Sequence, residues 1–320
     1  MVGEEIIILL FLLIVMGKSA SWAIRASRGL ARRAGLSEFL IGMVIVTFVS
    51  ILPETIIMIV SALRGTPALG LGTLLGSNVA DLTLIFGLVA LASPGDISTD
   101  RAFLKARHFS LFFLLLPVIL GYTGAYSRLD GLLLLAGGIL FFIFIARAKK
   151  RNGSPAAQNG NHRSAGAETA ILVLALGTMG LAATWAVQYA EILAQSIGMA
   201  PALVGLLIVA PGTCLPELIF SLRAVRRRRH TLAIGDILGG VIADASIVLG
   251  VVALINPFSF NPRIVIVTGV FMLLAGILFF SAIRSGRKLT RSEGLLLLAF
   301  YVVFVIVELA LQNWTPIITP

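Results

Sequence analysis

Two stretches of sequence decide the fold: TFVSILPE at residues 47–54 and APGTCLPE at residues 210–217. They lie 163 residues apart, and the same offset aligns the chain with itself from Met16 to Gly87 without a gap. This alignment contains 24 identities in 72 pairs. Because it matches Pro, Glu, Asp and Trp together, the shared composition of apolar helices does not explain it. The chain is therefore predicted to contain an internal duplication.

The composition is that of a membrane protein. Of the 320 residues, 58% are hydrophobic and 12% are charged, and the mean hydropathy is +1.02. A soluble chain of this length cannot bury so much apolar surface, so we expect the lipid bilayer as its surroundings and partner. The net charge of +10 is scattered over many short connections, which argues against nucleic acid as a partner. No soluble partner is implied.

Apolar stretches long enough to cross a bilayer, about 20 helical residues each, occur ten times. They are predicted at 4–24, 39–63, 69–93, 107–125, 130–147, 168–194, 201–223, 232–255, 263–283 and 292–312. Of the 25 lysine and arginine residues, 21 fall in the odd-numbered connections and three in the even-numbered ones. Because basic residues favour the cytoplasmic side, the sequence predicts a multi-pass protein of the cell membrane with both termini outside.

Each copy of the duplication holds five spans, so the second copy must enter the membrane upside down. Residues 1–147 are predicted to form the first inverted repeat, 148–167 a cytoplasmic linker, and 168–320 the second inverted repeat. The predicted fold class is an all-α integral membrane protein with ten transmembrane helices, some of them broken at the midplane. This architecture is typical of secondary transporters.

Both of the stretches that decide the fold end in a proline followed by a glutamate, Pro53-Glu54 and Pro216-Glu217. Proline has no amide hydrogen and disfavours the α conformation of the residue before it, so each helix should break just before the glutamate. In a bilayer such a break is tolerated where protein, water or a bound ion satisfies the backbone carbonyls. A simple proline kink is the alternative, but a glutamate in both copies favours an ion site.

A second pair of segments carries further acids at the midplane. Residues four apart share a helix face, so each copy has one polar stripe. The stripes are Thr73, Ser77 and Asp81 in the first copy and Asp236, Gly240 and Asp244 in the second. Asp236 lies eight residues before Asp244, about 12 Å nearer the cytoplasm. It is interpreted either as a metal ligand in an ion funnel or as a solvated residue near a helix start.

Four carboxylates are predicted to meet near the bilayer centre: Glu54, Asp81, Glu217 and Asp244. No lysine or arginine lies at comparable depth on their helices, so the four cannot all be ionised without bound cations or protons. Together with hydroxyls and backbone carbonyls they form an all-oxygen set of ligands, which suits Ca²⁺ or Na⁺ rather than zinc or copper. Such ions are transported substrates, and neither a cofactor nor a catalytic residue is expected.

These segments resemble those of the calcium/cation antiporter superfamily, most closely its prokaryotic sodium/calcium exchangers. The likeness covers nearly the whole chain, and in that branch the segments typically read G-T-S-L-P-E and G-S-N-x-x-[N/D]. The G-N-x-x-E pattern of the proton-coupled branch is absent. The resemblance implies that Glu54 and Glu217 bind Ca²⁺ centrally. It also implies that the surrounding calcium or sodium ligands are Ser50, Thr213, Ser77, Asp81 and Asp244.

The chain departs from the family pattern at four positions. Ile51 and Cys214 each stand in place of a hydroxyl, and Gly240 stands in place of a serine. Asp81 occupies a position where asparagine is usual. Sodium therefore has fewer neutral oxygen ligands than expected, whereas the additional carboxyl can accept a proton.

The function predicted from the sequence is antiport of Ca²⁺ against Na⁺ by alternating access, with H⁺ and K⁺ open as counter-ions. A proton-coupled exchanger of Ca²⁺ or another divalent cation is the first alternative. Only the pair Gly235-Asp236 suggests an intramembrane aspartyl protease. That hypothesis leaves the duplication unexplained. A metabolite transporter of the same topology needs no acidic cluster, and an ion channel would carry single-channel currents. The run Arg226–Arg229 is either a topology anchor beside anionic lipid or a regulatory lipid site.

Overall fold

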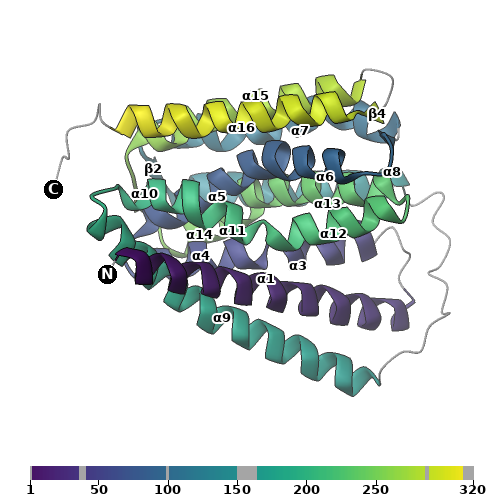
Figure 1. Ribbon diagram of the computed structural model, residues 1–320, viewed down its shortest axis with the longest axis horizontal. Coiled ribbons are helices and arrows are strands. Elements are labelled where there is room, and N and C mark those ends of the chain that lie inside the picture. Colours follow the sequence, from purple (N-terminus) through teal and green to yellow (C-terminus); the bar gives the residue numbers. More distant parts are fainter. Residues whose placement is uncertain (1, 36–40, 99–100, 150–163, 285–287, 313–320) are drawn as a thin grey trace.

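The computed structural model describes residues 2–35, 41–98, 101–149, 164–284 and 288–312, and most of these residues are helical. The long helices lie side by side along one axis of the molecule (Figure 1). The first half contains α1 (Val2–Arg33), η1 (Ile41–Val46), α3 (Thr47–Ser50), α4 (Leu52–Leu63), α5 (Pro67–Ala80), η2 (Asp81–Ile85), α6 (Phe86–Ala92), α7 (Arg101–Gly121) and α8 (Arg128–Lys149). The second half contains α9 (Ala165–Ser196), α10 (Pro201–Val204), η4 (Gly205–Val209), α11 (Ala210–Thr213), α12 (Leu215–Arg226), α13 (His230–Ala243), η5 (Asp244–Val248), α14 (Leu249–Ile255), α15 (Pro262–Arg284) and α16 (Arg291–Gln312). The elements η1, η2, η4 and η5 are π-helical.

Seven of the described helices are long and apolar enough to cross a membrane, and a bent pair makes an eighth. The bent pair joins Val44–Ser50 to Leu52–Leu63 at an angle of 44°. Outward-facing apolar side chains fit a lipid environment, since Trp22 is 51% exposed and Trp185 is 54% exposed. The chain is therefore a multi-pass membrane protein, while the count of ten spans stays a prediction.

The bounds of the helices recur at the offset of the sequence duplication. Helix α1 covers residues 2–33 and α9 covers 165–196, which is a shift of 163 at both ends. The same shift relates α4 to α12, α5 to α13, and α8 to α16. Most of the predicted linker, residues 148–167, lies outside the described residues.

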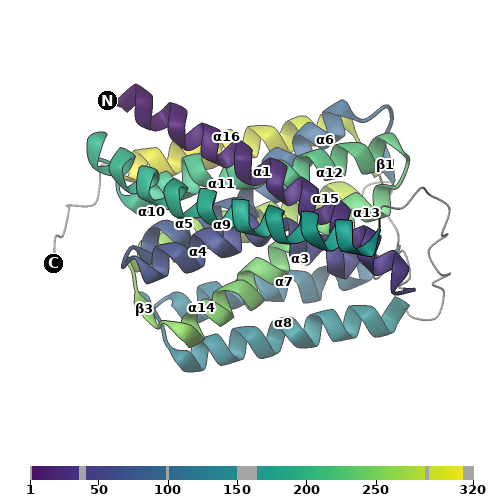
Figure 2. The same cartoon turned by 90° about the horizontal axis from the view of Figure 1, so that it is seen from below.

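The two halves are interleaved rather than packed as separate bodies. Helix α8 of the first half packs against α14 of the second (Figure 2), and α16 packs in the same way against α6. Glycines permit both contacts, because a Cβ on Gly131 would lie 2.8 Å from the carbonyl of Gly250, and one on Gly87 would lie 2.9 Å from the carbonyl of Gly294.

Short strands also join the halves. Strand β1 (Ile97–Ser98) pairs with β4 (Lys288–Leu289), and β2 (Ala125–Tyr126) pairs with β3 (Phe258–Ser259), both antiparallel. At the second of these ribbons, the buried Tyr126 hydroxyl donates a 2.7 Å hydrogen bond to the carbonyl of Pro117. The ribbons close the bundle at its two ends.

Helices α1 and α9 form a layer of their own on one face of the bundle. They lie side by side and run in opposite directions (Figure 1), and they share a separate apolar core. That core includes Met16 and Met179, both fully buried and related by the offset of 163. Only a few side chains of α4, α5 and the η4 region join it, among them Ile57. The α1/α9 layer is therefore packed more tightly within itself than onto the rest of the bundle.

Each half contains one interrupted helix, and the interruption falls three residues before the glutamate. Helix α3 ends at Ser50 and α4 begins at Leu52, so that Pro53 lies in the first turn, where its missing amide hydrogen is not needed. In the second half the break falls at Cys214, before Pro216. The predicted interruption before each glutamate is confirmed. It is a narrow kink, because the amide of Ile51 still donates to the carbonyl of Thr47 at 3.2 Å.

Candidate ion-binding site

Four acidic side chains are buried at the kinks and on the helices beside them. Glu54 lies in the first turn of α4 and Glu217 in the first turn of α12, directly after the kinks. Asp81 and Asp244 each begin a π-helical segment, η2 and η5. None of the four is more than 3% exposed. All four side chains are therefore buried away from bulk water.

These four carboxyl groups are close enough for their charges to interact. Glu54 interacts electrostatically with Asp81, and Glu217 with both of them. Asp244 interacts with Glu54 and Asp81. Like charges in a low-dielectric environment repel strongly, so this group favours cations or protons among its members.

Several carboxylate oxygens in this cluster have no hydrogen-bond partner in the described part of the chain. They are Glu54 Oε2, Asp81 Oδ1, both Oε atoms of Glu217 and Asp244 Oδ1. A buried, unsatisfied acceptor is costly, and functional ion sites are a common reason for it. Yet within the described ranges no three His, Cys, Asp or Glu side chains converge closely enough to hold a metal ion. The acids gather in one region without forming a closed cage.

Asp236 is buried with the other acids. It is 0% exposed, lies well inside α13, and accepts a 3.3 Å hydrogen bond from the Ser50 hydroxyl. Its Oδ2 has no partner among the described residues. The alternative of a solvated residue near a helix start is therefore wrong, because α13 packs against the α3 region there.

The kink of each half contacts the acid-bearing helix of the other half. Ser50, before the first kink, reaches Asp236 on α13. Cys214, at the second kink, lies 3.8 Å from the carbonyl of Ser77 on α5. Thr213 is a side-chain hydrogen-bonding neighbour of Glu54. The site residues predicted from the sequence thus come together across the two halves.

Glycines bring the backbones close at these crossings. A Cβ on Gly76 would lie 2.7 Å from the carbonyl of Leu206, and one on Gly239 would lie 3.0 Å from the side chain of Thr47. At Gly240 the nearest atom is a terminal methyl group of Ile51, 3.2 Å away. Positions 51 and 240, two of those that depart from the pattern this chain resembles, therefore face each other.

Three buried polar side chains with no predicted role also lie on these helices. Thr47 and Asn78 are 0% exposed and have side-chain atoms without partners among the described residues, and so does Ser221. Asn78 directly follows Ser77, and Ser221 lies one helical turn after Glu217, so spacing could have indicated both. The π-helical turns were also not predicted, because no residue pattern distinguishes them from α-helix.

The fold and this site define a membrane transporter with acidic groups buried in a helical bundle. The family profile described as sodium/calcium exchanger protein matches the chain twice, at residues 5–147 and 168–310. The chain belongs to the sodium/calcium exchanger family, and it is a multi-pass membrane antiporter of the calcium-transport class. Since the members of this family are exchangers, it is not an enzyme, and the protease alternative is not supported.

Known relatives match over nearly the full length. The chain is 33% identical over 315 residues to the inner membrane protein YrbG of Escherichia coli K12, covering 94% of each chain. It is 26% identical over 351 residues to the sodium/calcium exchanger MaX1 of Methanosarcina acetivorans, covering 96% of this chain and 99% of the relative. A structure of the sodium-calcium exchanger NCX_Mj, soaked with Na⁺ and Sr²⁺, is similar with a TM-score of 0.68 and 25% identity, over 96% of this chain and 99% of that one.

Proposed function

We propose that the chain exchanges Ca²⁺ against a monovalent cation by alternating access at the buried carboxylates. The observation that carries this proposal is the set of unsatisfied carboxylate oxygens on Glu54, Glu217, Asp81 and Asp244, two residues from each half. Because these acids repel one another, they bind cations that reduce the repulsion. When the site carries calcium they bind the divalent cation, and when it carries the counter-ion they bind monovalent cations or protons. Competition for the same oxygens couples the two ions, since neither can occupy the site while the other is bound.

The roles within the site follow from position. Glu54 and Glu217, directly after the two kinks, are the central Ca²⁺ ligands. The surrounding ligands are Ser50, Ser77, Asp81, Thr213, Asp236 and Asp244. Pro53 and Pro216 have no amide hydrogen to give to the carbonyls four residues earlier, which leaves backbone oxygens for an ion. In the described structure the acids do not yet converge closely enough to surround a metal ion. The proposal therefore requires them to move closer together when the ion binds.

The architecture proposed for this mechanism is a ten-helix inverted repeat, with repeats at 1–147 and 168–320 and a cytoplasmic linker at 148–167. The recurrence of helix bounds and the opposite directions of α1 and α9 (Figure 1) support it. The α1/α9 layer, which has its own core, slides against the bundle that holds the acids. Both chain ends lie outside the cell, and the arginine-rich connections lie in the cytoplasm.

The counter-ion is proposed to be Na⁺, as the names of the family and of MaX1 suggest. One observation favours H⁺ as a second candidate: the positions that lack the family's hydroxyls, Ile51 and Gly240, face each other inside the site. An apolar contact there removes neutral ligands for Na⁺ and leaves the acids to bind protons.

Radioactive Ca²⁺ uptake into proteoliposomes tests the proposal. One arm imposes an outward Na⁺ gradient at equal pH, and the other imposes a pH gradient with Na⁺ absent. Uptake that depends on the Na⁺ gradient supports Na⁺/Ca²⁺ exchange, and uptake in the second arm supports proton coupling. If neither gradient drives Ca²⁺ uptake by well-folded protein, calcium antiport is wrong. Parallel competition by Mg²⁺ reports selectivity among divalent cations.

A further inference from the structure

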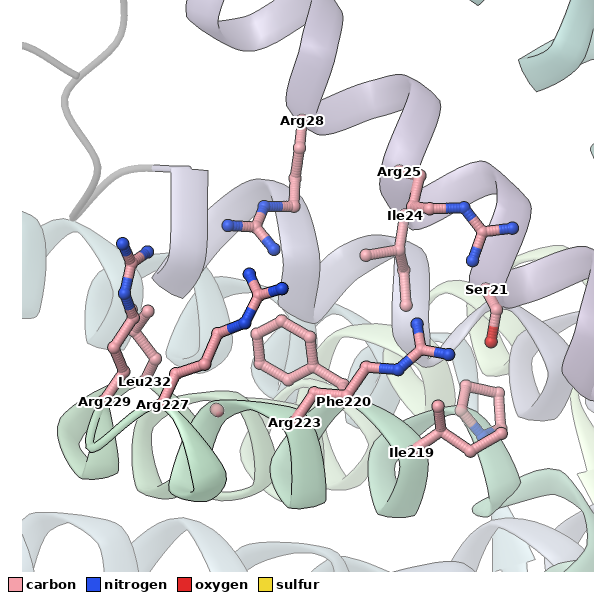
Figure 3. Close-up of a pocket in the computed structure, with 12 residues that line it drawn as sticks. Ser21, Ile24, Arg25, Arg28, Ile219, Phe220, Arg223, Arg227, Arg229 and Leu232 are labelled. Atoms are coloured by element: carbon pink, nitrogen blue, oxygen red, sulfur yellow. The ribbon is translucent and has the colours of Figure 1, made fainter. Parts of the chain in front are cut away.

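A cavity of about 220 Å³ lies between α1 and the segment from α12 to the start of α13 (Figure 3), and its lining includes Pro216, the residue before Glu217. Its apolar wall includes Ile24, Ile219, Phe220 and Leu232. Its polar wall is formed by Arg25, Arg28, Arg223, Arg227 and Arg229. This volume is large enough for a phosphate group and its first substituent.

The cavity has one sign of charge. Five of its twelve lining residues are arginines, and the described lining contains no aspartate or glutamate. Figure 3 shows these side chains reaching into the space between the two helices from both sides. Arg28 also lies over the ring of Phe220, 5.9 Å from its centroid, which holds its guanidinium at the cavity wall. The lining therefore presents several guanidinium groups to a ligand that enters the cavity.

We propose that this cavity binds a phosphate mono- or diester anion, such as the headgroup of an anionic phospholipid. Arginine is suited to phosphate because its planar fork donates two parallel hydrogen bonds to the oxygens. Arg25, Arg223, Arg227 and Arg229 are exposed, so the ligand can enter. The apolar wall beside them accommodates the carbon atoms that follow the phosphate, which favours an ester over a bare ion.

The position of the cavity gives the ligand a regulatory consequence, which rests on the proposed function. Its arginines come from α1, in the layer proposed to slide, and from the α12 region of the bundle that holds the acids. A bound phosphate bridges the two and opposes sliding. The binding itself does not depend on the transported ion.

Neighbouring arginines offer a matched control. Arg223→Gln/Arg227→Gln removes two charges from the cavity, and Arg226→Gln/Arg228→Gln removes two from the same run at positions that do not line it. Arg223→Lys/Arg227→Lys keeps the charge without the planar fork. Each purified variant is first checked for a monodisperse elution profile and for its thermal unfolding midpoint.

The assay measures binding rather than transport. Native mass spectrometry counts phosphatidylglycerol or phosphatidylcholine molecules retained on the protein, and a second arm titrates glycerol 3-phosphate and inorganic phosphate. We expect the cavity variant to lose affinity roughly 25-fold, about fivefold for each arginine, and the control variant to stay within about fivefold of the wild type. Retention of phosphatidylglycerol alone identifies a lipid site, and binding of the soluble phosphates identifies a site for free ligands.

Two results would overturn the proposal. Equal losses in the cavity and control variants would mean that the arginine run attracts anions by its overall charge and that the cavity plays no part. Absence of binding by folded wild-type protein in both arms would mean that the cavity holds no phosphate ligand. Either result leaves calcium transport untouched, so it is distinguishable from failure of the proposed function.

Discussion

The Ser50 hydroxyl lies 3.3 Å from Oδ1 of Asp236, in a buried hydrogen bond between residues 186 positions apart. Ser50 stands just before the kink of the first half, and Asp236 stands on α13 of the second. The offset of 163 relates Asp236 to Thr73 in the first half. The crossing that contains Asp236 therefore has an acidic side chain where the equivalent crossing has a hydroxyl group. The ion site proposed for this duplicated bundle is therefore chemically asymmetric.

Breaking this hydrogen bond should destabilise the protein and weaken ion binding together. In Ser50→Ala, Asp236 loses a hydrogen-bond donor and is left with an unsatisfied buried oxygen, which costs about 1–3 kcal/mol. In Asp236→Asn the amide can still pair with the hydroxyl, so the loss of Ca²⁺ affinity should exceed the loss of stability. Thermal unfolding in detergent and Ca²⁺ titration of the two variants and the double variant measure both effects.

A second double variant, built on Asp236→Ala, provides the internal check, because alanine removes the hydrogen bond that asparagine can keep. If the two side chains act as a pair, the effect of Ser50→Ala should be at least halved in the Asp236→Ala background. Strictly additive effects would mean that the contact carries no coupling energy.

Most features of the fold could be predicted from patterns in the sequence. The 163-residue offset predicted that α9 repeats α1, and the Pro-Glu pairs predicted kinks before Glu54 and Glu217, which the structure confirms. Burial of the acids was also predictable, since an acid within a long apolar span has no route to water except through protein.

The meeting of the acids from the two halves was predicted, but the particular side-chain hydrogen bonds between the halves could not be. Sequence spacing relates residues within one helix, whereas the pairing of Ser50 with Asp236 depends on how two distant helices cross. The π-helical turns that begin at Asp81 and Asp244 were missed for a related reason. Local propensity does not distinguish π-helix from α-helix, and tertiary packing selects between them.

Close backbone packing at Gly76 should make this position intolerant of any side chain. Gly76→Ala places a methyl group 2.7 Å from a backbone carbonyl, which cannot move aside, so we expect a loss of about 1–3 kcal/mol and a lower unfolding midpoint. Gly240→Ala is the matched control, because its methyl group meets a side-chain atom, the Cγ2 methyl group of Ile51, at 3.2 Å rather than a backbone carbonyl. Equal midpoints for the two variants would contradict this packing.

The contact between Ile51 and Gly240 should influence the choice of counter-ion. Restoring hydroxyls with Ile51→Ser/Gly240→Ser adds two neutral oxygen ligands, which favours Na⁺ over H⁺ at the site. We expect the ratio of Na⁺-driven to pH-driven Ca²⁺ uptake to rise by about tenfold, corresponding to ~1.4 kcal/mol of ion selectivity. The control is Gly240→Ala, which fills the same space without a hydroxyl. An unchanged ratio in a folded, active double variant would remove these positions from the account of ion selectivity.

The most direct measurement is gradient-driven Ca²⁺ uptake into proteoliposomes by Glu54→Gln and Glu217→Gln. Both substitutions preserve shape and remove the charge that is proposed to bind calcium. We expect uptake to fall to the level of empty liposomes while elution profile and unfolding midpoint stay close to those of the wild type. Glu191→Gln is the matched control, because Glu191 pairs with Arg64 at 3.2 Å outside the site, and it should transport normally. Normal Ca²⁺ uptake by both Glu54→Gln and Glu217→Gln would contradict the proposal that these carboxylates form the transport site.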